Sequence, residues 1–237
     1  MTDILGRALL DYHNGNYTED IITTTNISED DTLPLPYLYR SFSEMPKLEQ
    51  RALKECQGKI LDVGCGAGSH SLWLQEKELQ VKAIDISEGA IKVAKARGIQ
   101  NAVQANILEV TEETFNTILL LMNGTGIFET VEKTTEYLQH LKSILAPKGQ
   151  LLIDSSDLQY MYDRNEDGSI WVPQQRYYGE LEFTMRYKGE TSAPFPWLYL
   201  HETLFQKLAE ANEFTFEIVK RGKNFDYLAR LTHINIL

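Results

Sequence analysis

The chain contains 237 residues, of which 34 are acidic and 23 are Lys or Arg, so its formal net charge is −11. This length suits one α/β domain with additions and makes two independent domains unexpected. The basic residues form no patch and no arginine-rich tail. A phosphate backbone would therefore be repelled, and we expect a small-molecule partner rather than nucleic acid.

Cysteine usage and the N-terminal residues indicate the cellular compartment and the absence of cross-links that we expect. The two cysteines, Cys56 and Cys65, show neither a pairing pattern nor a Cys/His ligand spacing, so we expect no disulfide and no metal site. The first ten residues lack a basic start, a long apolar core and a cleavage site, and no apolar run approaches bilayer length. We expect no membrane attachment and a cytoplasmic location.

The N-terminal segment, residues 1–48, is predicted to form a helical cap or lid. Residues 2–13 place apolar side chains at helical spacing on one face. Residues 17–36 contain an acidic patch and end in a proline-rich turn, which indicates a linker or lid. Pro46 then begins a helix that runs to about Cys56.

Aromatic residues gather beside a cation just before that helix: Tyr37, Tyr39 and Phe42 flank Arg40. In one interpretation they form the hydrophobic underside of the cap. In the other, their faces close over a positively charged ligand and a substrate, while Arg40 meets a carboxylate. The sequence leaves both interpretations open.

A glycine loop joins a short apolar strand to a helix at Lys59–His70. Gly64 and Gly66 permit backbone angles that a β-carbon forbids, and Gly68 with Ser69 opens the helix with free N–H groups. An anionic or hydrogen-bond-accepting ligand is expected there. The dinucleotide fingerprint would place its third glycine one residue later, so a nicotinamide or flavin dinucleotide is the weaker interpretation.

The second strand, residues 80–86, ends in an acid. Asp85 lies at the distance beyond the glycine loop at which α/β nucleotide sites place a carboxylate for ribose hydroxyls. Alternatively, Asp85 is the N-cap of the helix that begins near Ser87. A third strand is predicted at residues 101–106.

Leu61-Asp62-Val63-Gly64-Cys65-Gly66-Ala67-Gly68 resembles the first motif of the class I S-adenosylmethionine-dependent methyltransferases. The resemblance implies S-adenosylmethionine as cofactor, held by Asp62, Gly64, Gly66, Gly68 and Asp85, and the carboxylate that Arg40 would meet is then that of the cofactor or of the substrate. It implies that Ile86 and Ile107 flank the adenine. Asn106 stands where the family commonly has an Asp that accepts from the adenine amino group, which is a departure.

The fourth strand, an almost unbroken apolar run from Phe115, reads as a central parallel strand. Asn123 follows it, at the edge where the family places a residue close to the transferable methyl group. Asn123-Gly124-Thr125-Gly126 differs from the Asn-Pro-Pro-aromatic pattern of base-modifying enzymes, which argues against such a substrate. Alternatively, Asn123-Gly124 is only a turn that favours positive φ.

The fifth strand, residues 150–154, leads into Asp154-Ser155-Ser156-Asp157. This edge of an open α/β sheet faces the ligand crevice, so either acid could bind substrate or accept a proton. Equally, these residues could form a turn that caps a helix.

Residues 158–200 read as a β-rich insertion. Apolar and polar residues alternate over 177–187, and residues 197–200 are expected to pair back with that strand. The insertion is either a surface sheet or dimer contact, or a source of substrate selectivity. For the second role the candidate side chains are Trp171, Arg176, Tyr177, Tyr178 and Trp197.

A helix at 201–212 and a hairpin at 214–233 complete the chain, and the methyltransferase family ends in the same way. The resulting prediction is an α/β, Rossmann-like, doubly wound and mostly parallel seven-stranded sheet with an antiparallel terminal hairpin. The N-terminal cap and the small antiparallel insertion are added to it. Residues 49–237 would form the methyltransferase-like domain.

The implied reaction is in-line displacement at the cofactor's methyl carbon, which needs alignment more than a side-chain nucleophile. If a base is required, the candidate residues are His13, His70, Asp157 and His201, although an isolated His is more often structural; Asn123 is a further catalytic candidate because of its position near the methyl group. Two alternatives remain, a non-catalytic S-adenosylmethionine-binding domain and an NAD-type oxidoreductase. The sequence does not define the acceptor, the methylated atom or the oligomeric state.

Overall fold

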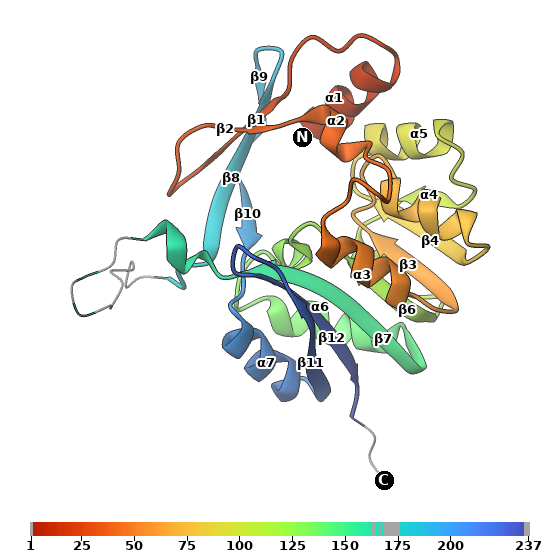
Figure 1. Ribbon diagram of the computed structural model, residues 1–237, viewed down its shortest axis with the longest axis vertical. Helices are drawn as coiled ribbons and strands as arrows, with labels where there is room; N and C mark the ends of the chain where they lie inside the picture. The colour runs from red at the N-terminus through yellow and green to blue at the C-terminus, as the bar shows by residue number, and fades with distance from the viewer. Residues whose placement is uncertain (1, 163–164, 166, 168–175, 235–237) are drawn as a thin grey trace.

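The computed structural model describes residues 2–162, 165, 167 and 176–234, which form two sheets (Figure 1). The larger sheet has seven strands in the order β11-β12-β7-β6-β3-β4-β5. Its strands are β3 (Lys59–Val63), β4 (Gln80–Asp85), β5 (Ala102–Gln104), β6 (Phe115–Leu120), β7 (Leu145–Ser156), β11 (Phe214–Arg221) and β12 (Asp226–His233).

The pairing of these strands confirms the predicted fold class. β3, β4, β5, β6 and β7 pair in parallel, whereas β12 runs antiparallel to both β7 and β11. The central strands β6 and β7 are largely buried because both faces of the sheet are covered. The last strand of the terminal hairpin, β12, therefore lies between β7 and β11.

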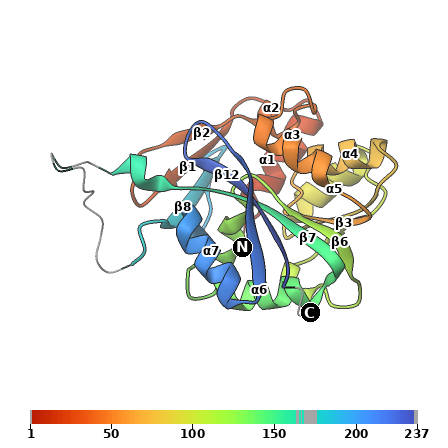
Figure 2. The same ribbon diagram turned by 60° about the horizontal axis from the view of Figure 1, so that its bottom comes forward.

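Helices cover both faces of this sheet (Figure 2). On one face lie α3 (Lys47–Glu55), α4 (Ser69–Glu76) and α5 (Glu88–Ala96), and on the other lie α6 (Thr134–Ser143) and α7 (Glu202–Ala211). Alternate residues of one strand serve the two layers: Leu119 packs with the α3 and α4 side chains, and Ile118 with those of α6 and α7. Short 3-10 turns follow β5, β6 and β7: η1 (Ile107–Glu109), η2 (Gly124–Phe128) and η3 (Leu158–Met161).

The smaller sheet has five antiparallel strands drawn from two distant parts of the chain. These strands are β1 (Ile21–Thr25), β2 (Asp31–Leu33), β8 (Glu180–Tyr187), β9 (Glu190–Thr191) and β10 (Phe195–Leu198). β8 is central, pairing with β10 on one side and β1 on the other. This confirms the antiparallel insertion but corrects the prediction for residues 17–36, where β1 and β2 replace the expected linker or lid.

The physical reason for that error is the partner of β1. Its sequence is Ile-Ile-Thr-Thr-Thr, which is β-branched throughout but has no alternating apolar pattern, and its pairing register joins Ile22 to Arg186. Such a strand forms because a distant strand offers it an edge. The division of the chain into a cap of residues 1–48 and a domain of residues 49–237 stays a prediction.

The N-terminal helix α1 (Ile4–His13) packs against α5, and α2 (Leu35–Leu38) follows the smaller sheet. At the crossing, Asp3 Oδ2 accepts hydrogen bonds from the Ser87 hydroxyl at 2.9 Å and from the Gly89 amide at 3.0 Å. A β-carbon on Gly89 would lie 2.5 Å from the Gly6 backbone, so only glycine permits this approach. Across the described residues, no helix combines the length and the apolar character needed to cross a membrane.

Candidate functional site

The glycine loop leaves β3 with three residues in the left-handed region. Gly64, Gly66 and Gly68 have φ of 72°, 53° and 82°. A β-carbon on Gly64 or Gly66 would meet no atom within 4 Å, whereas one on Gly68 would lie 2.1 Å from Ile99 Cδ1. Gly68 therefore packs against Ile99 in a left-handed conformation that favours glycine, while Gly64 and Gly66 face open space where a ligand can approach the backbone.

Asp85, at the end of β4, faces the same loop. Its Oδ2 accepts the Gly66 amide at 2.9 Å, and its Oδ1 accepts the Ser87 amide at 2.8 Å. Burial raises the pKa of Asp85, and these two amide hydrogen bonds oppose that rise. The N-cap of α5 is Ser87, whose hydroxyl accepts from Ala90, so Asp85 does not serve as that cap.

Asp62 lies beneath the loop rather than at its surface. It is 2% exposed, and its Oδ2 accepts the Ser71 hydroxyl at 2.6 Å. Burial raises the pKa of Asp62, while the Ser71 hydrogen bonds and His70 oppose this effect. This contact joins β3 to the first turns of α4. The role of Asp62 that these contacts show is therefore structural.

The predicted adenine-binding residues occupy different environments. Ile86 is 72% exposed, which is unusual for a large apolar side chain directly after a central strand. Ile107 is buried in the core. Asn106 is the N-cap of η1, where its Oδ1 accepts the Leu108 amide at 3.0 Å. Ile86 thus offers an uncovered apolar surface, while Asn106 already has a local partner.

A buried ionic cluster formed by Arg40, Glu49 and His70 lies against the first turn of α4. The Arg40 guanidinium donates to Glu49 Oε2 at 2.5 Å, and His70 Nε2 lies 2.8 Å from the same oxygen. Arg40 also donates to the Tyr37 carbonyl, and its Nε is buried without a partner among the described residues. One donor of a buried cation therefore has no partner among the described residues.

Sequence reasoning missed Glu49. Burial raises its pKa, but the hydrogen bond and charge of His70 and the charge of Arg40 outweigh burial, and the pKa of Glu49 is lowered overall. One signal was present: Glu49 is an acid in the first turn of α3 beside Leu48, on the face that packs into the core. A buried acid requires a partner.

The aromatic residues of the N-terminal segment have separate roles. The Tyr39 hydroxyl donates to the Leu9 carbonyl at 2.7 Å, and burial raises the pKa of Tyr39 to about 12. Phe42 stacks on Trp73 with ring centroids 4.4 Å apart. The cap interpretation therefore describes Tyr39 and Phe42. The Arg40 guanidinium instead stacks on the Tyr37 ring, 3.9 Å from its centroid. Tyr37 also lines a cavity.

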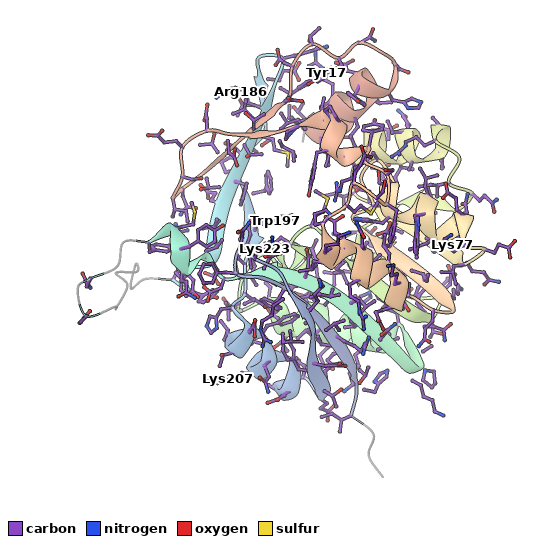
Figure 3. The ribbon with its side chains drawn as sticks, viewed as in Figure 1. Tyr17, Lys77, Arg186, Trp197, Lys207 and Lys223 are labelled. Atoms are coloured by element: carbon purple, nitrogen blue, oxygen red, sulfur yellow. The ribbon has the colours of Figure 1, made fainter. Side chains whose placement is uncertain are left out.

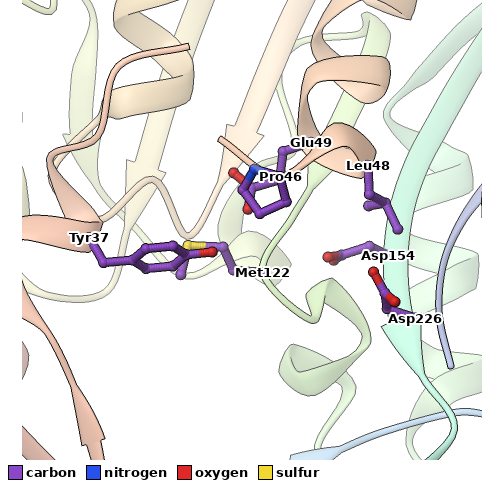
Figure 4. Close-up of a pocket in the computed structure, with 7 residues that line it drawn as sticks. All are labelled: Tyr37, Pro46, Leu48, Glu49, Met122, Asp154 and Asp226. Atoms are coloured by element: carbon purple, nitrogen blue, oxygen red, sulfur yellow. The ribbon is translucent and has the colours of Figure 1, made fainter. Parts of the chain in front are cut away.

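That cavity, the acidic cavity, has a volume of about 280 Å³ and lies at the carboxyl ends of β6 and β7 (Figure 4). It is lined by Tyr37, Pro46, Leu48, Glu49, Met122, Asp154 and Asp226. Asp154 Oδ1 accepts the Gly124 amide at 2.8 Å. Burial raises the pKa of Asp154 to about 6, so this carboxyl group can exchange a proton near neutral pH.

Asn123, predicted near the methyl group, has its side chain engaged. Its Nδ2 donates to the Leu198 carbonyl at 3.1 Å, and its Oδ1 accepts the Ser155 hydroxyl at 3.2 Å. Its φ of 62° agrees with the turn interpretation. Next to it, Trp197 packs so closely on η2 that a β-carbon on Gly126 would lie 2.0 Å from the indole. Figure 3 shows Trp197 where β10 approaches the larger sheet.

Three other predicted residues come together at the base of the insertion. The Tyr178 hydroxyl donates to Asp157 Oδ1 at 2.6 Å, and the Tyr178 ring lies parallel to that of His201 with centroids 6.1 Å apart. His201 Nδ1 accepts the Leu204 amide and caps α7. Burial raises the pKa of Tyr178 and lowers that of His201. None of the three lines the acidic cavity.

The remaining candidates add little to the site. His13 is exposed at the end of α1. Trp171 lies outside the described residues. Within the described ranges, no group of His, Cys, Asp or Glu side chains is arranged to hold a metal ion.

Comparisons with known proteins agree with this geometry. A methyltransferase domain family matches residues 54–216. A crystal structure of a SAM-dependent methyltransferase from Bacteroides fragilis, in complex with S-adenosyl-L-homocysteine, superimposes with a TM-score of 0.91 at 40% identity, covering 98% of this chain and 94% of that one. The chain belongs to the class I S-adenosylmethionine-dependent methyltransferases. S-adenosylmethionine is the cofactor of this family, and the open glycine loop fits it.

Curated relatives are more distant. The putative methyltransferase YqeM of Bacillus subtilis is 27% identical over 48% of this chain and 48% of its own length. The ribosomal RNA small subunit methyltransferase C of Alcanivorax borkumensis is 26% identical over 44% of this chain and 34% of its own length. The chain thus spans about half or less of the length of these two relatives.

Proposed function

We propose that this chain transfers a methyl group from S-adenosylmethionine to a small-molecule acceptor. The observation that carries the proposal is the acidic cavity of about 280 Å³, which opens at the same sheet edge as the bare glycine loop. Cofactor and acceptor sites of open α/β sheets lie at this edge.

The cofactor would use the residues on the β3 and β4 side of the edge. Amides of the Gly64–Gly68 loop would meet its amino-acid end, and Asp85 would accept from the ribose hydroxyls. Ile86 would cover one face of the adenine. Arg40 would bind the carboxylate, because its Nε is buried and unpartnered and its cluster lies against α4.

Catalysis would rest on alignment. The sulfonium already provides a good leaving group, so fixing the acceptor in line with the methyl carbon can contribute on the order of 7–11 kcal/mol. No nucleophilic side chain is then needed. The side chain of Asn123 is engaged with Leu198 and Ser155, so its part would be to shape the turn beside the methyl group.

Charge supports a small acceptor over nucleic acid. The chain carries a net charge of −11, and the cavity adds the carboxylates of Glu49, Asp154 and Asp226. A polyphosphate backbone would be repelled from such an entrance. The ribosomal RNA relative shares only part of its length with this chain, so its substrate does not outweigh this argument.

Calorimetry with S-adenosylmethionine, S-adenosylhomocysteine and NAD tests cofactor choice. We expect micromolar binding of the first two and none of NAD. Release of S-adenosylhomocysteine in the presence of small metabolites then separates an enzyme from a non-catalytic binding domain. A protein that ignores both adenosyl ligands at millimolar concentration would contradict the proposal.

Replacement of Arg40 tests the orientation of the cofactor. Arg40→Gln should weaken S-adenosylhomocysteine binding about tenfold, as expected for loss of one hydrogen bond to a charged group. The same variant should bind 5′-methylthioadenosine, which lacks the amino-acid end, as well as the natural chain does. Equal losses for the two ligands would place the carboxylate elsewhere.

A further inference from the structure

Ligands of open α/β sheets bind at the carboxyl ends of the strands, here called the ligand edge. The strand order divides this edge into two halves. The predicted cofactor residues follow β3, β4 and β5, on one side of the sheet. The acidic cavity takes Met122 from the end of β6, Asp154 from β7 and Asp226 from the start of β12, on the other side. The cavity therefore lies where an acceptor would sit beside the cofactor, and its lining describes the acceptor.

The side chains that line the cavity are acidic, and the Arg40 guanidinium that pairs with Glu49 and stacks on Tyr37 is buried and not part of the lining. Its titratable side chains are three carboxylic acids and Tyr37, and among the described residues it is lined by no Lys, Arg or His. An acceptor that carries a carboxylate or phosphate near its reactive atom would be repelled, whereas a cation would be attracted.

Glu49 contributes an unsatisfied oxygen at the cavity wall. The residue is 4% exposed, and both its contacts, with Arg40 and with His70, are made by Oε2. Among the described residues Oε1 has no hydrogen-bond partner. Oε1 is not enclosed by protein, so it is open to the cavity, where a ligand N–H group can donate to it.

Asp154 faces the same space from the opposite wall. Figure 4 shows its carboxylate beside that of Asp226, with the Tyr37 hydroxyl pointing toward them from the other side. The Gly124 amide fixes Oδ1 of Asp154 in this orientation. Leu48, Pro46 and Met122 complete an apolar wall, which suits the carbon skeleton of an organic amine.

We infer that the acceptor is a primary or secondary amine, held as its ammonium ion between Glu49 and Asp154, and that Asp154 accepts its proton. This inference rests on the proposed function. It assigns the methylated atom as nitrogen, and it makes Asp154 a catalytic residue because the carboxylate touches the reacting nitrogen.

The step balances without a further reactant. The ammonium N–H passes its proton to the Asp154 carboxylate, and the freed lone pair attacks the methyl carbon. The new C–N bond forms as the C–S bond breaks, and that bond's electron pair stays on sulfur to give S-adenosylhomocysteine. The N-methylated product leaves as a cation, and Asp154 returns its proton to water.

Matched pairs of probes test the inference in the full chain with saturating S-adenosylmethionine. The probes are benzylamine against benzyl alcohol, cyclohexylamine against cyclohexanol, and glucosamine against glucose, with benzoate as an anionic probe. We expect at least tenfold higher kcat/KM for an amine than for its alcohol, and no turnover of benzoate. In a bacterial small-molecule extract incubated with methyl-labelled S-adenosylmethionine, the labelled product, once separated from the cationic cofactor, should be retained on a cation exchanger.

Two variants separate the acceptor site from the cofactor site. Asp154→Asn keeps an oxygen for the Gly124 amide, and it should lower kcat/KM for the amine at least 100-fold while S-adenosylhomocysteine affinity changes less than twofold. Glu113→Gln also removes one negative charge, but its partners are Lys59 and Lys82 and it does not line the cavity, so it should behave as the natural chain.

The outcomes are distinguishable. Turnover of alcohols or benzoate in place of amines, or label that is not retained on the exchanger, overturns the amine assignment. A loss of S-adenosylhomocysteine affinity in Asp154→Asn as large as the loss of turnover would assign this carboxylate to the cofactor's own ammonium group and overturn it as well. A chain that fails to bind S-adenosylhomocysteine at all contradicts the proposed function instead.

Discussion

The two halves of the ligand edge are built by different means. On the β3 and β4 side, Gly64, Gly66 and Asp85 come from two consecutive strand ends, and the glycine backbone itself offers the binding surface. On the β6 and β7 side, the acidic cavity draws side chains from five separated segments, from Tyr37 to Asp226. The first half is local in sequence, and the second exists only after folding.

This difference explains which half can carry variable chemistry. A left-handed glycine loop admits few substitutions, because each β-carbon would add strain or fill the ligand's space. Side chains that converge from separate segments can change one at a time without disturbing the sheet. The cofactor half is therefore constrained by backbone geometry, and the acceptor half by the charge and shape of its lining.

The largest test of the cofactor half is Asp85→Ala. We expect at least 100-fold weaker binding of S-adenosylhomocysteine, because two hydrogen bonds to a charged group at about 1.5 kcal/mol each are lost. Calorimetry measures the loss, and 5′-methylthioadenosine should lose as much because it keeps the ribose. If the variant melts normally and binds both ligands as before, Asp85 has only its loop contacts.

Two glycines test whether the cofactor half needs open space next to the backbone or only tolerates left-handed strain. Gly64 and Gly189 have φ of 72° and 76°, and a β-carbon on either would meet nothing within 4 Å. Each alanine variant should lose about 1–2 kcal/mol of stability through left-handed strain. Only Gly64→Ala should also lose about tenfold or more in S-adenosylhomocysteine affinity. Equal affinities in the two variants would mean that the ligand does not approach Gly64.

The smallest expected effect is on stability, and it tests the acceptor half of the ligand-binding edge. Burial raises the pKa of Asp154 from 3.8 to about 6, so the folded state binds its proton more tightly, and this group's contribution to stability falls as pH rises through that window. Asp154→Asn should therefore raise the melting temperature at pH 8 by a few degrees, as about 1–2 kcal/mol would.

The same variant should differ little from the natural chain at pH 4, where the folded carboxyl is protonated. Scanning calorimetry at the two pH values provides the measurement. A lower melting temperature at pH 8 would show that the charged carboxylate is satisfied by the protein alone and is not held ready for a ligand.

The sequence predicted a mostly parallel seven-stranded sheet and its final hairpin, because central strands show apolar runs and the glycine loop has a characteristic spacing. It also placed Gly64, Gly66 and Asp85 together correctly, since consecutive parallel strands end at one edge. These are properties of contiguous segments, which a single sequence displays.

The sequence could not supply the lining of the acidic cavity. Glu49 reads as an ordinary acid on an amphipathic helix, and Asp226 as part of a hairpin turn, until the fold brings both to one cavity. The position of Asn123 near the transferred methyl group stays a prediction, and the sequence did not show that its side chain bonds to Leu198 and Ser155. Asp157, Tyr178 and His201 do meet, but away from the cavity.

The pairing of β1 with β8 has a consequence for synthesis of the chain. Residues 22–25 emerge from the ribosome long before residues 183–186, their partners in the register. At typical elongation rates of 5–20 residues per second the interval is roughly ten to thirty seconds. During that time β1 can pair only with β2, so the smaller sheet cannot be completed until β8 has emerged, and a chaperone would shield the open edge of β1 until then.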